Sequence, residues 1–192
     1  MVASDDLRLI ESTLAGDTEA FGELVLRYQD RLCGTLVHML GSVHDARDVA
    51  QEAFLLAFEK LETFRRESSF YSWLFRIAYN AAISQRRKER KNRRSIDHQK
   101  DQTGSEPTDS RPANDPAYQL EIEDSQRQVR EALDELGEEY RDAIVLKELE
   151  GLRYEEIAEI LGCPIGTVRS RIHRARQLLR EKLARVTERE QT

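Results

Sequence analysis

A polar stretch rich in proline divides the chain between residues 96 and 118. It holds three of the four prolines of the 192-residue sequence (Pro107, Pro112 and Pro116), and Asp, Ser, Thr and Gln are prominent in the rest. Such a segment buries too little apolar surface to offset the entropy lost on ordering, so we expect a flexible linker. The sequence therefore predicts two small domains, residues 1–95 and 119–192, in place of one large domain.

The first predicted domain is entirely helical. Gly16-Asp17-Thr18 can cap a helix whose apolar residues recur at intervals of three and four. Gly41-Ser42 ends that helix and can cap a second one, and a third helix begins near Phe70. The expected inner face of the second helix is Ala46, Val49, Ala50, Ala53, Phe54, Ala57, Phe58 and Leu61. The third helix is expected to bury Trp73, Leu74, Ile77, Ala78 and Ala81.

The second predicted domain is also helical, and no segment of the chain alternates strongly enough for a strand. The fold class is therefore expected to be all-α. Helices are expected over residues 121–136, 138–150, 154–161 and 166–186. The first of these is expected to turn Ile122, Val129 and Leu133 toward the core.

The last two helices and the turn between them, Gly162-Cys163-Pro164, form a helix-turn-helix pattern. The expected inner residues are Ile157, Ala158 and Leu161 on the short helix and Val168, Ile172, Ala175 and Leu179 on the long helix. The opposite face of the long helix carries Thr167, Ser170, Arg171 and Arg174, flanked by Arg169, His173 and Arg176. An exposed basic face near the start of such a helix is typical of DNA reading in the major groove. The alternative is an ordinary amphipathic helix with a solvated basic face, but the turn and the small Ala158 favour DNA reading.

The distribution of charge supports a nucleic-acid partner. The net charge of −6 argues weakly against one. However, residues 84–95 and residues 165–185 each hold seven Lys or Arg and one Glu, so each stretch carries +6 and the remaining residues carry −18. A local field attracts a polyanion far better than a net charge does.

Aromatic residues crowd into the segment before the first basic stretch. Six of the thirteen aromatic residues lie within residues 64–79, namely Phe64, Phe70, Tyr71, Trp73, Phe75 and Tyr79. For any single one of them burial in the core is the favoured interpretation, above all for Phe70 and Trp73. The cluster as a whole, beside a basic run, indicates binding of single-stranded nucleic acid by stacking.

Other functions lack support in the sequence. No catalytic motif is present, so we expect no enzyme activity and no cofactor. The four histidines and two cysteines show no metal-ligand spacing, and two distant cysteines indicate reduced thiols in the cytoplasm. The longest apolar run has six residues, whereas a membrane-spanning helix needs about 20, and no signal peptide is evident, so we expect no membrane insertion.

Three segments resemble the extracytoplasmic-function (ECF) group of bacterial RNA polymerase sigma factors, in the sigma-70 family. Asp45–Phe54 is similar to the family's core-polymerase-binding segment in region 2.2. Trp73–Asn80 is similar to the region 2.3–2.4 helix beside the −10 promoter element. Tyr154–Gly162 together with Gly166–Arg176 resembles the helix-turn-helix of region 4.2.

The resemblance implies an alternative sigma factor that binds core RNA polymerase and directs promoter recognition, DNA opening and transcription initiation. The residues implied to contact core polymerase are Asp45, Asp48, Gln51, Glu52 and Phe54. Those implied at the −10 element are Phe64, Arg65, Arg66, Ser68, Ser69, Arg76, Asn80, Arg86 and Arg87. Those implied at the −35 element are Thr167, Arg169, Ser170, Arg171, Arg174 and Arg176. Members of this group are commonly held by an anti-sigma factor, which is a further expected partner.

Three other functions remain open at this stage. A sigma-like protein that captures an anti-sigma factor would need no basic DNA-reading face. A dimeric helix-turn-helix repressor would not need the Asp45–Phe54 segment. An enzyme ranks last. Primary sigma factors carry further regions before and between these segments, for which this chain has no room, and this favours the compact, alternative type.

Overall fold

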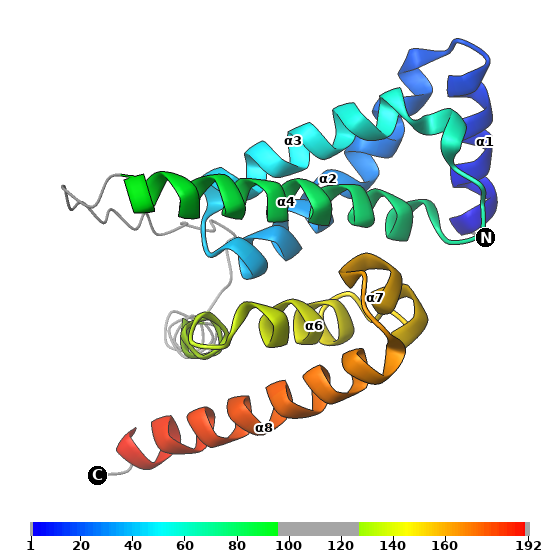
Figure 1. The fold of residues 1–192 in the computed structure, drawn as a ribbon. Coiled ribbons are helices and arrows are strands. Elements are labelled where there is room, and N and C mark those ends of the chain that lie inside the picture. Colours follow the sequence, from blue (N-terminus) through cyan, green and yellow to red (C-terminus); the bar gives the residue numbers. More distant parts are fainter. Residues whose placement is uncertain (1, 96–126, 191–192) are drawn as a thin grey trace, which may run out of the picture. The chain divides into compact units, whose positions relative to one another are not determined.

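The computed structural model describes residues 2–95 and 127–190 (Figure 1). Every regular element within these two ranges is a helix, so the all-α prediction is confirmed. The chain divides into two compact units, made chiefly of residues 1–103 and of residues 104–192. The predicted linker at 96–118 and the predicted core residue Ile122 lie outside the described residues.

The first unit is a bundle in which the third helix packs against two neighbours. Its elements are α1 (Val2–Leu14), α2 (Thr18–Leu40), α3 (Val43–Glu59), the short 3-10 helix η1 (Leu61–Thr63) and α4 (Phe70–Ser95). α3 packs against α2 and α4, while α1 packs against α2 and touches η1.

α1 has no counterpart among the helices predicted from the sequence. It buries Leu9 and Ile10, and its Asp6 is buried as well. The Asp6 carboxylate accepts hydrogen bonds of 2.5 Å from the Tyr28 hydroxyl and from Arg27 Nη1 on α2. Burial, and then the hydrogen bond to Asp6, raises the pKa of Tyr28. A polar cluster therefore fastens α1 to α2.

The helix boundaries between α2 and α3 follow the predicted caps. Asp17 Oδ1 accepts a hydrogen bond from the Glu19 amide, 3.1 Å away. Gly41 has a φ of 72°, in the left-handed region that strains residues with a Cβ, and its amide donates to the Val37 carbonyl. Ser42 Oγ then accepts from the Asp45 amide at 3.2 Å and caps α3. These local contacts fix where α2 stops and α3 begins.

The core of the first unit lies between α2, α3 and α4. All the predicted inner residues of the second helix are buried except Phe58, which is 42% exposed. On α4, Leu74, Ala78 and Ala81 are buried as expected. Trp73 and Ile77, however, are only half-buried. The start of α4 is apolar on almost every side, and α2 and α3 cover the side that carries Phe70, Tyr71, Leu74, Phe75 and Ala78.

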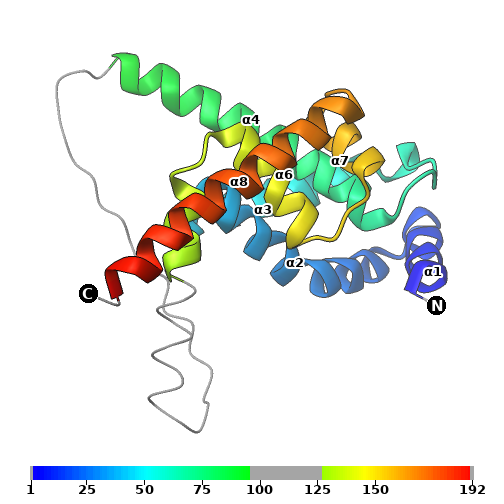
Figure 2. The ribbon, with the colours of Figure 1, turned by 90° about the horizontal axis from the view of Figure 1, so that it is seen from below.

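The second unit consists of short helices followed by one long helix. Residues 127–134 are helical and are followed by α6 (Glu138–Glu148), α7 (Tyr154–Leu161) and α8 (Ile165–Glu190) (Figure 2). α6 buries Ala143, Ile144, Val145 and Leu146, and it packs against α8. Leu133 is buried as predicted, but Val129 is 45% exposed, so its predicted inward orientation is wrong. Leu136, which was not among the predicted inward residues, is buried as well.

Candidate functional site

The turn between α7 and α8 has the geometry of a helix-turn-helix. Gly162 adopts a left-handed φ of 61°, as the sequence suggests. The Cys163 amide donates to the Ala158 carbonyl at 3.1 Å and closes the end of α7. The Pro164 carbonyl accepts from the Thr167 amide at 2.9 Å, within the first turn of α8. The chain therefore turns over a few residues, and α8 begins as a separate helix.

The two faces of α8 separate as predicted. Val168, Ile172 and Ala175 are buried, and Leu179 is half-buried. On α7, Ile157 is buried, whereas Ala158 and Leu161 are half-buried. The predicted outer residues Arg169, Ser170, Arg174 and Arg176 are exposed, and Thr167 and Arg171 are half-buried. The buried stripe thus fixes α8 in place and leaves a basic face toward solvent.

Three outer residues of α8 already have local partners. Arg171 Nη1 lies 3.7 Å from Cys163 Sγ, so its guanidinium rests over the turn. Ser170 Oγ donates to the Thr167 carbonyl at 2.9 Å, which leaves its lone pairs available to an incoming donor. Arg174 Nη1 lies 3.4 Å from the amide oxygen of Gln177 on the same helix.

Residues outside α8 shape the charge of this face, and sequence reasoning missed them. Arg176 forms an ion pair of 2.6 Å with Glu148 of α6, and this hydrogen-bonded partner raises the pKa of Arg176. Two cations lie near the Tyr154 ring: Lys147 Nζ is 5.0 Å and the Arg169 guanidinium carbon 5.8 Å from its centroid. No local pattern pairs these positions, because residues 147, 154 and 169 belong to three separate helices.

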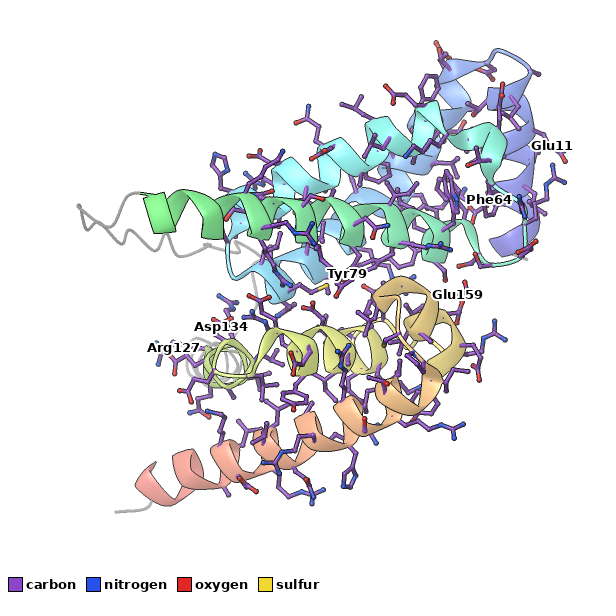
Figure 3. The ribbon with its side chains drawn as sticks, in the orientation of Figure 1. Glu11, Phe64, Tyr79, Arg127, Asp134 and Glu159 are labelled. Carbon is purple, nitrogen blue, oxygen red and sulfur yellow. The ribbon has the colours of Figure 1, made fainter. Side chains whose placement is uncertain are left out.

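In the first unit, two half-buried aromatic residues lie close together, Phe64 in the loop between η1 and α4 and Trp73 in the first turn of α4. The Phe64 ring lies 5.3 Å from the Trp73 ring and 6.0 Å from the Phe70 ring, centroid to centroid. Tyr71, Phe75 and Tyr79 are buried, so they are not free to stack on bases. Figure 3 labels Phe64 in this loop and Tyr79 farther along α4. Within residues 64–79 the aromatic rings that are not fully buried are therefore Phe64 and Trp73, and the predicted core burial of Trp73 is wrong.

The polar residues of this loop divide into free and engaged groups. Arg65, and Arg76 and Asn80 on α4, are exposed. Arg66 forms an ion pair of 2.9 Å with Glu11 of α1. Ser69 Oγ accepts from the Ser72 amide at 3.0 Å and so caps α4, while Ser68 Oγ donates to the Ser69 carbonyl at 3.4 Å. Ser69 thus has a structural role in starting α4.

The beginning of the basic stretch is tied to the bundle. The Arg86 guanidinium donates to the Met39 carbonyl in the last turn of α2, where a cation is favourable. Gln85 Nε2 donates to Asp45 Oδ1 of α3 at 3.1 Å. Arg87 is exposed. Of the two arginines assigned to DNA in this stretch, Arg86 is engaged with the protein and Arg87 points into solvent.

α3 borders an apolar groove of about 490 Å³ against α2. Asp48, Gln51 and Glu52 are exposed on α3, Asp45 is half-buried, and His44 Nδ1 lies 3.1 Å from Asp48. Phe54 is only 7% exposed, although it lines the groove. Leu55 and Phe58 also line it and are 61% and 42% exposed. The apolar surface on offer therefore comes mainly from Leu55 and Phe58, which were not among the predicted contact residues.

The described ranges hold neither a candidate metal site nor a membrane-spanning helix. Within residues 2–95 and 127–190, no three His, Cys, Asp or Glu side chains are grouped so that they could hold a metal ion. None of the helices described for this chain combines the length and the apolar character needed to cross a membrane.

Comparison with known proteins matches both units to regions of one protein family. The family model described as "Sigma-70 region 2" matches residues 24–92, and "Sigma-70, region 4" matches residues 126–179. The ECF RNA polymerase sigma-E factor of Haemophilus influenzae is 40% identical over 183 residues, covering 93% of this chain and 95% of the relative. The RNA polymerase sigma-H factor of Pseudomonas aeruginosa is 37% identical over 187 residues, covering 95% and 96%.

Two solved structures are similar to this chain in fold. The sigma factor RpoE of Bartonella quintana, solved with the anti-sigma factor NepR, matches with a TM-score of 0.71 and 28% identity, over 85% of this chain and 96% of that one. CnrH, solved with the cytosolic domain of CnrY, matches with a TM-score of 0.66 and 27% identity, over 94% and 97%.

A region 2 followed by a region 4 defines the class of sigma factors, which are non-catalytic factors of transcription initiation. The chain belongs to the sigma-70 family of RNA polymerase sigma factors, in the ECF group. It acts as an alternative sigma factor, with core RNA polymerase and promoter DNA as its partners. The resemblance drawn from the sequence is thereby confirmed.

Proposed function

We propose a division of labour between the two units of this sigma factor. The C-terminal domain, residues 119–192, reads the duplex −35 element. The N-terminal domain, residues 1–95, holds core polymerase and the opened −10 region, and residues 96–118 link the two. The observation that carries this proposal is α8, which buries Val168, Ile172 and Ala175 and turns an arginine-rich face outward.

In the −35 complex, α8 would enter the major groove. Arg174 and Ser170 lie on the exposed face near its start, and Arg171 lies beside the turn. A guanidinium bidentate to guanine supplies about 1–3 kcal/mol of discrimination against the wrong base. Arg169 and Arg176, on the flanks, would hold phosphates, which positions the helix without reading sequence.

In the −10 complex, the loop before α4 would receive an unpaired base. Opening the duplex costs a few kcal/mol per extruded base, which stacking and pocket contacts offset. The half-buried Phe64 and Trp73 offer an aromatic platform, and Arg65, Arg76 and Asn80 are exposed around it. Arg87 would hold the adjoining backbone.

The outer surface of α3 would contact core polymerase. Gln51 and Glu52 are exposed there beside the apolar groove. An apolar patch rimmed by polar residues is typical of a protein-binding site. Asp45 and Asp48 would add acidic contacts. The largely buried Phe54 would contribute to the lining of the groove.

We further propose that the chain itself catalyses no reaction, that it acts in the cytoplasm, where the polymerase is, and that an anti-sigma factor restrains it. The last point rests on the relative from Bartonella quintana, which was solved in such a complex.

The test is to map transcript start sites with core polymerase, genomic DNA and this chain. We expect new transcripts whose upstream sequences share two elements at a constant spacing. If no transcript depends on the chain, the proposal is wrong, and a sigma-like protein that captures anti-sigma factors without touching DNA becomes the better account.

A further inference from the structure

We propose that Glu11 of α1 is a positioning residue for the −10 loop: its ion pair with Arg66 holds residues 64–69 in the conformation that receives DNA. The inference rests on the proposed role of this loop at the −10 element. It also gives a function to α1, the helix that the sequence did not predict. Figure 3 labels Glu11 on α1 and Phe64 in the loop, both at the same end of the first unit.

The Arg66 backbone needs an external hold. Its φ of 61° is the only positive φ of a non-glycine residue in the described part of the chain. A left-handed backbone is strained for any residue with a Cβ, and such strain persists only where surrounding contacts impose it. Within the described residues, Arg66 forms an ion pair from its Nη2 to Glu11 Oε1, at 2.9 Å.

α1 is fastened well enough to supply that hold. Asp6 accepts hydrogen bonds of 2.5 Å from both Tyr28 and Arg27, and Asp5 pairs with Arg27 at 2.5 Å. α1 also touches η1, the element directly before the loop. Glu11 therefore projects from a helix fixed to α2, and it links that helix to a loop that has no regular structure of its own.

The neighbouring arginines differ from Arg66 in their ion pairing. Arg65 and Arg76 have no ion-pair partner among residues 2–95 and 127–190. They are thus available to phosphates or bases, whereas Arg66 is engaged with the protein. This contrast assigns Arg66 to holding the loop, and it replaces the direct DNA contact expected for Arg66 from the sequence.

A charge swap separates the two roles of Arg66. The probe is a promoter duplex from the start-site map whose −10 segment is kept unpaired by mismatches. Holoenzyme binding is measured for wild type, Glu11→Gln, Arg66→Glu and the double variant Glu11→Arg with Arg66→Glu. We expect Glu11→Gln to weaken binding by about two- to fivefold, the range of an exposed ion pair. Arg66→Glu should weaken binding more, because two carboxylates then face each other, and the double variant should recover to within about twofold of wild type.

Two controls make the outcomes distinguishable. Arg65→Glu should weaken binding, and adding Glu11→Arg should not restore it. Base discrimination within the unpaired −10 segment should fall in Glu11→Gln while thermal unfolding stays unchanged, which a purely structural ion pair would not produce.

Each possible failure points to a different error. If the double variant binds no better than Arg66→Glu, or if Glu11→Gln binds more tightly than wild type, Arg66 contacts DNA directly and the inference is wrong. If neither Arg65→Glu nor Arg66→Glu changes binding, the loop does not contact the −10 element, and the proposed function fails together with the inference.

Discussion

The guanidinium of Arg176 on α8 lies 2.6 Å from the carboxylate of Glu148 on α6. An anion beside an arginine that we propose to bind a DNA phosphate would oppose DNA binding. We therefore predict that Glu148→Gln raises the affinity for duplex −35 DNA by about two- to fivefold, because each partner of the pair is half-exposed and the pair is correspondingly weak. The change should also increase the slope of log affinity against log salt concentration, by up to the contribution of about one phosphate contact.

Fluorescence anisotropy over a series of salt concentrations measures both effects. Glu131→Gln is the matched control, since it removes one exposed carboxylate from the same unit without touching Arg176. An equal gain in both variants would show that net charge, and not the ion pair, controls the affinity.

Positions 171 and 172 should separate DNA contact from folding. Ile172 is 1% exposed, so Ile172→Ala is expected to lower the free energy of unfolding by about 2–5 kcal/mol. Arg171 is half-buried on the polar face of α8, so Arg171→Ala should change the free energy of unfolding by less than about 1 kcal/mol. Chemical denaturation followed by circular dichroism compares the two variants. A loss of several kcal/mol in Arg171→Ala would mean that the guanidinium serves the turn rather than DNA.

The groove beside α3 should be the main apolar contact with core polymerase. Leu55→Ser is predicted to weaken polymerase binding by about fivefold or more, since it removes an exposed apolar side chain whose burial at the contact would stabilise the complex. Gln51→Ala should weaken binding less. Competition against labelled wild type for core polymerase gives both values.

Leu26→Ser is the control for that experiment. Leu26 is 70% exposed on α2 but does not line the groove, so its substitution should leave polymerase binding unchanged. If Leu26→Ser and Leu55→Ser had equal effects, the groove would not be the contact. Phe54→Ala is less informative, because the buried ring also contributes to the core.

The cluster that fastens α1 should make stability fall at alkaline pH. Burial and the hydrogen bond to Asp6 raise the pKa of Tyr28 above its unfolded value of about 10. A raised pKa means that the folded state binds the proton more tightly, so this contribution is present below about pH 10 and is lost as the pH rises further. Tyr28→Phe should be less stable than wild type at pH 8, and the difference should shrink above pH 10. A constant difference across that range would contradict the hydrogen-bonded role of the hydroxyl.

The predictable parts of this fold are those with a local cause. Val168, Ile172 and Ala175 recur at helical spacing, and burial on one face of α8 follows directly. Gly41 and Gly162 end their helices in the left-handed conformation that only glycine adopts without strain. The faces of α8 and the helix boundaries could therefore be inferred without the structure.

The features that the sequence did not predict depend on partners far away in the chain or on surplus apolar surface. α1 escaped prediction because its polar Asp6 is buried only through Arg27 and Tyr28, more than 20 positions away. On α4, aromatic residues lie on several sides at once, so periodicity could not tell that Tyr79 is buried while Trp73 is half-exposed. Ion pairs between separate helices have no local sequence pattern at all.

The most direct test of the division of labour crosses protein variants with promoter changes. Holoenzyme affinity is measured on promoters in which each base pair of the −35 and −10 elements is replaced in turn, for wild type and for the Arg171→Ala, Arg174→Ala double variant. We predict that the double variant folds normally, loses discrimination at one or two −35 positions and keeps wild-type discrimination at every −10 position. Unchanged discrimination at −35, or a loss confined to −10, would contradict the assignment of α8 to the −35 element.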